Sequence, residues 1–165
     1  MGYAQLNKGA LSLAALMVGI SALSGEAQTY DLEKAELAKS YFAACSTVAE
    51  GASGEAISSA IDTCKTSMND IAGLFSAYPD HTPMDVNVLA IYSGSAAYVV
   101  LALDMQLHEN RLSVDGCNHA YHVENMYNML TDGTSEDVEA QLRKNATTVQ
   151  DHLIPWCEDA YGADE

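Results

Sequence analysis

The sequence predicts an all-α protein, an antiparallel bundle of about five helices around a buried central helix, with disulfides stapling the helices together. Three observations support this prediction. The stretch from Val86 to Leu103 contains no charged residue, and a helix that is apolar on all sides must be buried on all sides. The flanking segments repeat apolar residues every three or four positions, and no run alternates with period two for long enough to form a strand. Four cysteines, an even number, could supply the disulfides.

Length and charge narrow the class of protein. The 165 residues fit one domain with its own hydrophobic core. The chain has 23 acidic and 7 basic residues, a formal charge of −16. This balance argues against nucleic acid as a partner, because phosphate binding requires clustered Lys and Arg, and it disfavours anionic membrane surfaces. It suits solubility and cationic partners.

Residues 1–27 have the layout of a secretory signal peptide. A basic residue precedes the apolar run Ala10–Ile20, and small residues follow that run. Cleavage is expected after Ser24 or after Ala27, since each has a small residue two positions before it. The run is short for a membrane span, and an uncleaved signal anchor is the alternative. We therefore expect a periplasmic or secreted protein with a single helical-bundle domain over residues 28–165 and no stable membrane insertion after signal removal.

Two amphipathic helices are expected before the central one. Apolar residues at steps of three and four predict the first helix over Asp31–Glu50. A glycine-containing turn follows, and Ser53 is a good cap for the second helix. Tyr78-Pro79 ends that helix, because the residue before a proline avoids helical geometry. The apolar residues of the second helix are Ile57, Ile61, Cys64, Met68, Ile71 and Phe75.

The central helix has a clear start signal. Thr82 is a cap, Pro83 fits the first helical position, and Asp85 completes a pattern close to a capping box. Small residues at 93–97 would let neighbouring helices approach closely. Asp85 and Asp104 flank the apolar stretch without a basic anchor, so we interpret it as a core helix and not as a membrane span.

Two further helices complete the bundle. Ser113 opens the fourth, whose apolar side carries Cys117, Ala120, Val123, Tyr127 and Leu130. A turn at 131–133 leads to the fifth, which Pro155 must kink or end. The acidic tail from Glu158 is expected to fray.

The cysteines Cys45, Cys64, Cys117 and Cys157 are expected to form two disulfides in an exported chain. In an up-and-down bundle, the ends of helices one and five and the start of helix four share one pole. This geometry favours Cys45–Cys64 and Cys117–Cys157 among three connectivities. The first pair lies about two turns apart along the bundle, yet bridged Cα atoms lie within about 7 Å, so the connectivity stays open at this point.

The candidate metal ligands are His119, His122 and Met126. The two histidines are three residues apart on one helix, so their rings could converge on one ion, and Met126 follows one turn later. Histidine and methionine suit copper outside the cytoplasm, and histidine also suits zinc. The competing interpretation is a pair of helix histidines without a metal, since no further ligand is identifiable.

Two other groups of residues could form sites. Four tyrosines could line a ligand pocket between helices three and four, although buried tyrosines with satisfied hydroxyls are the simpler interpretation. They are Tyr92, Tyr98, Tyr121 and Tyr127. His108 with Asp104, or His152 with Asp151, could form a base with its orienting carboxylate, but solvated surface pairs are more common.

The sequence favours binding over catalysis. It lacks a Gly-x-Ser-x-Gly elbow, a phosphate-binding loop, a His-Glu-x-x-His motif and a dinucleotide fingerprint. We expect an exported accessory protein, of inhibitor or immunity type, that binds a protein partner and needs no cofactor. The alternative is a periplasmic carrier of copper, zinc or a small ligand. A small hydrolase built on a His–Asp pair is the third hypothesis.

Overall fold

The computed structural model describes residues 28–76, 82–130 and 136–162, and all regular structure within them is helical. The signal-peptide prediction for 1–27 lies outside these residues. In the described residues five helices pack together, and the fifth is bent into three parts. Their bounds are α1 Gln28–Ala43, α2 Gly54–Ser76, α3 Pro83–Leu107, α4 Val114–Asn128, α5 Glu136–Thr148, the π-helical turn η2 Val149–Leu153, and α6 Ile154–Tyr161.

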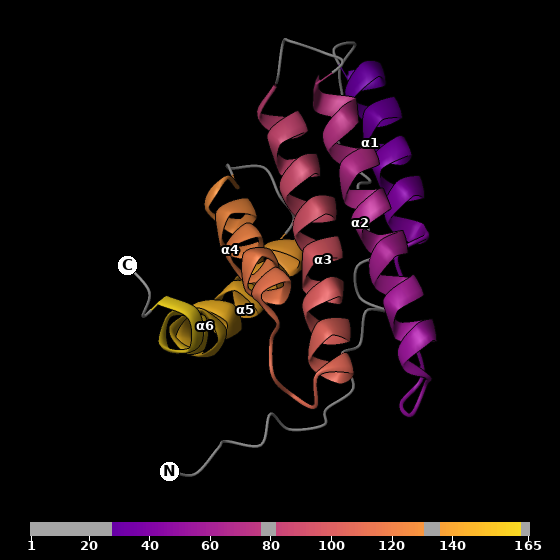
Figure 1. Cartoon of the computed structure of the whole chain (residues 1–165). Coiled ribbons are helices and arrows are strands. Elements are labelled where there is room, and N and C mark those ends of the chain that lie inside the picture. Colours follow the sequence, from indigo (N-terminus) through magenta and orange to yellow (C-terminus); the bar gives the residue numbers. More distant parts are fainter. Residues whose placement is uncertain (1–27, 77–81, 131–135, 163–165) are drawn as a thin grey trace.

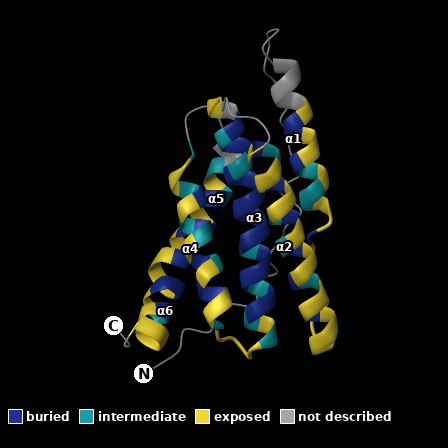
Figure 2. Cartoon of the chain, turned by 45° about the horizontal axis from the view of Figure 1, so that its top comes forward, coloured by how far each residue is buried: buried dark blue, intermediate teal, exposed yellow. Residues whose placement is uncertain are grey.

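Helix α3 lies at the centre of the bundle. Helices α1 and α2 run beside it on one side, and α4 lies against it on the other, with α5 and α6 packed on α4 (Figure 1). Residues of α3 take part in all three apolar clusters of the core, and Figure 2 shows α3 buried along most of its length. The predicted arrangement, a buried central helix covered by its neighbours, is confirmed.

The segment Asp85–Leu107 is long and apolar enough to cross a membrane, and it is the one helix in the described residues with that property. However, 78% of its most apolar window is buried inside the protein. A helix at the core of a bundle also has to be long and apolar, because other helices cover it on all sides. The burial of α3 by its neighbours therefore explains its length and its apolar composition.

The start of α3 is held by a buried ion pair. The predicted capping box is present: Thr82 Oγ1 accepts from the Asp85 backbone N–H at 3.2 Å, and Asp85 Oδ2 accepts from the Thr82 N–H at 2.8 Å. Lys34 of α1 donates to Asp85 Oδ1 at 2.6 Å, and both side chains are 2% exposed. Burial alone would raise the pKa of Asp85, but its bonds to Lys34 and Thr82 outweigh burial and lower that pKa.

The end of α3 is held by a second buried carboxylate. Asp104 is 4% exposed and accepts from the backbone N–H and the hydroxyl of Ser113, both at 2.8 Å. The Ser113 hydroxyl also accepts from the Gly116 N–H at 3.0 Å, so Ser113 caps α4 as predicted. The two helices meet so closely here that a Cβ on Gly116 would lie 2.1 Å from Asp104 Oδ2. Only glycine fits at this position.

The disulfides are Cys45–Cys64 and Cys117–Cys157. This is the pairing that the expected positions of the helix ends favoured. The first bond required a correction to the expected helix bounds. Helix α1 ends at Ala43, not at Glu50, and Cys45 lies in the loop that follows. Because the chain leaves the helix early, it can return along α2 and bring Cys45 beside Cys64, ten residues into that helix. The axial offset is therefore taken up by the loop.

Pro155 kinks the fifth helix without ending it. Proline lacks the N–H that an α-helix would need and clashes with the carbonyl four residues earlier. The π turn η2 precedes it, with the Ile154 N–H bonded to the Val149 carbonyl, and α6 then continues to Tyr161. The expected fraying from Glu158 is therefore wrong for the first residues of the tail. The Tyr161 hydroxyl donates to the Leu112 carbonyl at 2.9 Å and holds this end of α6 in place.

The buried ion pair predicts an asymmetric response to mutation. Lys34→Met should cost about 3 kcal/mol of folding stability, because it leaves the Asp85 carboxylate buried without its counter-ion. The double variant Lys34→Met/Asp85→Asn should be more stable than Lys34→Met, since an amide keeps the Thr82 contact without a buried charge. Urea denaturation of both variants measures the difference, and a double variant no more stable than the single one would contradict this account.

The contact between α3 and α4 predicts opposite effects at two glycines. Gly116→Ala should destabilise the fold by about 2 kcal/mol, because the new methyl group overlaps the Asp104 carboxylate. Gly73→Ala is the matched control: Gly73 lies within α2 with nothing within 4 Å of an added Cβ. That change should stabilise the protein by roughly 0.8 kcal/mol through helix propensity. Equal thermal unfolding of the two variants would show that the close contact is absent in solution.

Candidate functional site

The predicted ligands His119, His122 and Met126 lie on successive turns of α4, along its border with α3 and α2. Both histidines are half-buried, and Met126 is 9% exposed. Met126 packs directly against α3, since a Cβ added to Gly94 would lie 3.0 Å from the Met126 Cβ. The small residues at 93–97 therefore do allow a close helix approach, as expected, and Met126 fills the space that Gly94 leaves.

His122 is bound to a residue that the sequence analysis did not single out. The hydroxyl of Ser93, on α3, lies 2.9 Å from His122 Nε2, and Ser93 is 2% exposed. Because a buried hydroxyl needs a partner, this hydrogen bond satisfies Ser93 and fixes the imidazole against α3. Ser93 is one of several buried polar residues in the uncharged stretch of α3, with Asn87 and Ser95, so the sequence carried no signal that distinguished it.

His119 belongs to a bridge between α2 and α4. Its Nε2 lies 3.9 Å from Asp115 Oδ2, and the same carboxylate oxygen accepts from Lys65 of α2. The Lys65 and Asp115 side chains are partly exposed, at 34% and 55%, so their attraction is weakened by solvent. The bridge joins helices on either side of α3.

Both histidines favour the neutral form. Burial lowers the pKa of His119; Lys65 lowers it further, while Asp115 and Asp104 act in the opposite direction. Burial and the nearby His119 lower the pKa of His122. A neutral imidazole is the form that binds a metal ion, which is consistent with the metal-ligand prediction.

The geometry nevertheless gives that prediction little support. His122 Nε2 faces Ser93, and Met126 is packed into the contact with α3. Within residues 28–76, 82–130 and 136–162, no group of three or more His, Cys, Asp or Glu side chains is placed to hold a metal. A copper or zinc site at His119, His122 and Met126 therefore stays a prediction.

The four tyrosines do not share one pocket. Tyr92 is 5% exposed, and its ring lies 5.9 Å from that of Phe42, centroid to centroid. Tyr98 packs in a different apolar cluster, with residues of α4 and α6. Tyr121 is 37% exposed, and Arg143 lies over the ring of Tyr127. Their roles are in packing and at the surface.

The His–Asp pairs differ in structure. His108 Nδ1 lies 3.3 Å from Asp104 Oδ1, and Asp104 also binds Ser113. The carboxylate thus lies between the hydroxyl and the imidazole, whereas a nucleophilic triad needs the imidazole between the other two groups. His152 and Asp151 are both exposed on η2.

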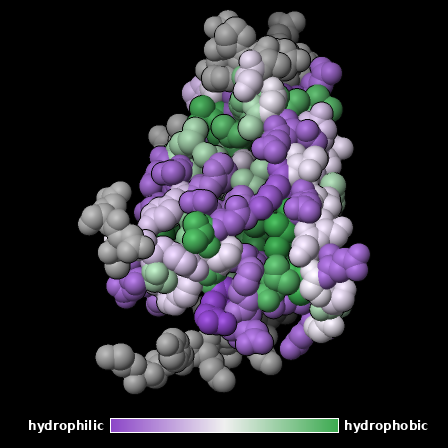
Figure 3. All heavy atoms as spheres, in the orientation of Figure 1, coloured by the Kyte–Doolittle hydropathy of each residue, from purple (hydrophilic) through white to green (hydrophobic). Residues whose placement is uncertain are grey.

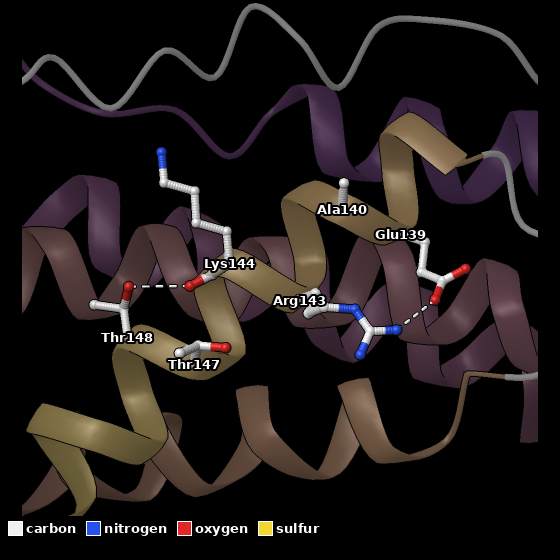
Figure 4. Close-up of a pocket in the computed structure, with 6 residues that line it drawn as sticks. All are labelled: Glu139, Ala140, Arg143, Lys144, Thr147 and Thr148. Atoms are coloured by element: carbon white, nitrogen blue, oxygen red, sulfur yellow. Dashed lines mark hydrogen bonds and ion pairs between the residues drawn. The ribbon is translucent and has the colours of Figure 1, made fainter.

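A shallow, open depression lies on the outer side of α5. It is lined by Glu139, Ala140, Arg143, Lys144, Thr147 and Thr148, all from this one helix. Arg143 donates to Glu139 at 2.6 Å, and Thr148 donates to the Lys144 carbonyl (Figure 4). Because one helix supplies every lining residue, a ligand would be contacted from one side only, unlike ligands in the concave sites that bind small molecules.

Comparisons with protein-family models, with curated proteins and with solved structures find no match for this chain.

The half-buried histidines predict a loss of stability in mild acid. Because their pKa values are lower in the folded state, the unfolded chain takes up protons first as the pH falls below about 6.5. The free energy of unfolding should therefore decrease between about pH 7 and about pH 5. His119→Gln/His122→Gln should flatten this dependence, measured by urea denaturation across that range. The control His152→Gln, at an exposed position, should retain it; an unchanged slope in the double variant would contradict the prediction.

Proposed function

We propose that this chain is an exported binding protein, of inhibitor or immunity type, that acts by contacting another protein and not by catalysis. The supporting observation is the use of its buried polar groups. Asp85 binds Lys34, Asp104 binds Ser113, and Ser93 binds His122, and each of these bonds joins α3 to another element. These groups hold the helices together, which leaves the surface as the place for function.

Export is part of this proposal. Two disulfides persist in oxidising compartments and are rare in reducing ones, and they are compatible with an extracellular or periplasmic protein. The apolar segment Ala10–Ile20 supplies the targeting signal. The formal charge of −16 favours a cationic partner over an anionic one.

The intact mass of the exported protein tests this proposal. The full-length chain, expressed in a bacterium, should appear in the exported fraction without residues 1–24 or 1–27. It should lack four hydrogens, two for each disulfide, and reductant should restore them. A full-length mass confined to the membrane fraction would instead support a retained signal anchor.

The alternative function, a periplasmic copper or small-ligand carrier, is favoured by the neutral, half-buried histidines alone. Native mass spectrometry of the same exported protein, titrated with copper and zinc, separates the two functions. A carrier should take up one ion, with His122→Ala reducing the occupancy and His152→Ala leaving it unchanged. A binding protein without a metal site should show equal, weak uptake in all three.

A further inference from the structure

We infer that the outward side of α4 is a docking surface for a basic amphipathic helix of a partner protein. This inference rests on the proposed binding function and names the surface that performs it. The core side of α4 is formed by residues such as Gly116, Ala120 and Val123. The opposite side is uncharged: it carries Val114, Asn118, Tyr121, Asn125 and Asn128 at steps of four and three, and then Met129 at the C-cap, four residues after Asn125.

These six residues, which we call the α4 stripe, are exposed to solvent. Val114, Tyr121 and Met129 are 58%, 37% and 39% exposed, which makes them three of the five large apolar residues exposed in the described chain. Figure 3 views the molecule from the side on which α4 lies in front of α5, and it shows small apolar areas between hydrophilic residues. The stripe therefore combines apolar anchors with amide groups that can form hydrogen bonds.

The absence of charge from the α4 stripe is notable in a chain with 23 acidic residues. The centres of protein interfaces are depleted in charged residues and enriched in tyrosine and methionine. Carboxylates border the stripe on both sides: Asp115, which is paired with Lys65, on one side, and Glu124, which accepts from Gln150, on the other. Asp151, next to Gln150 on η2, is exposed. The surface thus has an uncharged centre and an acidic edge on its Glu124 side.

This pattern of charge selects the occupant. An uncharged centre with an acidic edge is complementary to a helix that has apolar residues on one face and Lys or Arg along the border of that face. A second copy of this chain would bring another charge of −16 and is opposed by repulsion. An anionic lipid surface is opposed for the same reason. The stripe spans positions 114–129, about 22 Å of helix, which matches about four turns of a partner helix.

A synthetic peptide tests the surface directly. The probe is an 18-residue peptide (roughly five helical turns) of Leu and Lys placed at helical spacing, and its control has the same composition in scrambled order. The exported protein should bind the probe about tenfold more tightly than the control. Tyr121→Ser/Met129→Ser should abolish that difference, because it removes two apolar anchors without changing charge. Leu37→Ser, at a residue 41% exposed on α1, is the matched control and should have no effect.

Three outcomes would overturn the inference: equal binding of probe and control, binding unaffected by the Tyr121→Ser/Met129→Ser change, or a protein dimer that this change dissolves. A photo-crosslinking residue at Asn125, and another at Leu37, separates this inference from the proposed function. Capture of a partner at Leu37 but not at Asn125 would reject the α4 stripe and leave the binding function standing. Capture at neither position, with no probe binding, would count against both.

Discussion

The fold depends on covering an uncharged helix whose two end carboxylates are also buried. Between Asp85 and Asp104, α3 carries no charge, so its apolar surface is favourable only when other helices exclude water from it. The carboxylates at its ends must in turn be paired or hydrogen-bonded, because a buried charge without partners is very costly. Lys34 on α1 and Ser113 at the start of α4 provide those partners. Each end of the core helix thereby fixes the register of one covering helix.

The two disulfides attach two further parts of the chain, the loop after α1 and helix α6. Cys45–Cys64 ties the loop after α1 to the middle of α2, and Cys117–Cys157 ties α4 to α6. Each bond closes a loop of the unfolded chain, with sequence separations of 19 and 40 residues, and so reduces the entropy that folding must overcome. Apolar burial selects the arrangement, and the covalent bonds limit the alternatives.

Local sequence patterns were sufficient for much of this fold. The caps Thr82 and Ser113 and the central helix follow from short motifs, whereas the alternation of helix directions favoured the cysteine pairing among three connectivities without deciding it. The end of α1 could not be predicted, because apolar periodicity continues to Ala49 while the Cys45–Cys64 bond draws the chain out of the helix. The length of α6 was also missed, since its last residues are held by the contact of Tyr161 with Leu112, which is 49 residues earlier. Long-range contacts decided both cases.

The candidate site shows the same division between local and long-range information. Spacing alone placed His119, His122 and Met126 on one side of a helix, and they do lie there. It could not show that α3 approaches α4 so closely at Gly94 that the Met126 side chain is packed between the two helices. Nor could it show that Ser93 forms a hydrogen bond with His122 Nε2. The same holds for the tyrosines, whose shared pocket required a helix arrangement that the core does not adopt.

The interior therefore leaves little polar chemistry unassigned. In the described part of the chain, Ser95 Oγ is the one buried side-chain oxygen or nitrogen without a hydrogen-bond partner. Asp85, Asp104 and Ser93 join one element to the next, whereas Ser67 and Asn145 bond within their own helices. If the chain acts by binding, as proposed, its recognition chemistry lies on the outside of the bundle. Under the proposed binding function, the formal charge of −16 would attract a cationic partner but would not orient it. Orientation needs a surface where close contact does not bury unpaired charge, and the uncharged outer side of α4 meets that requirement.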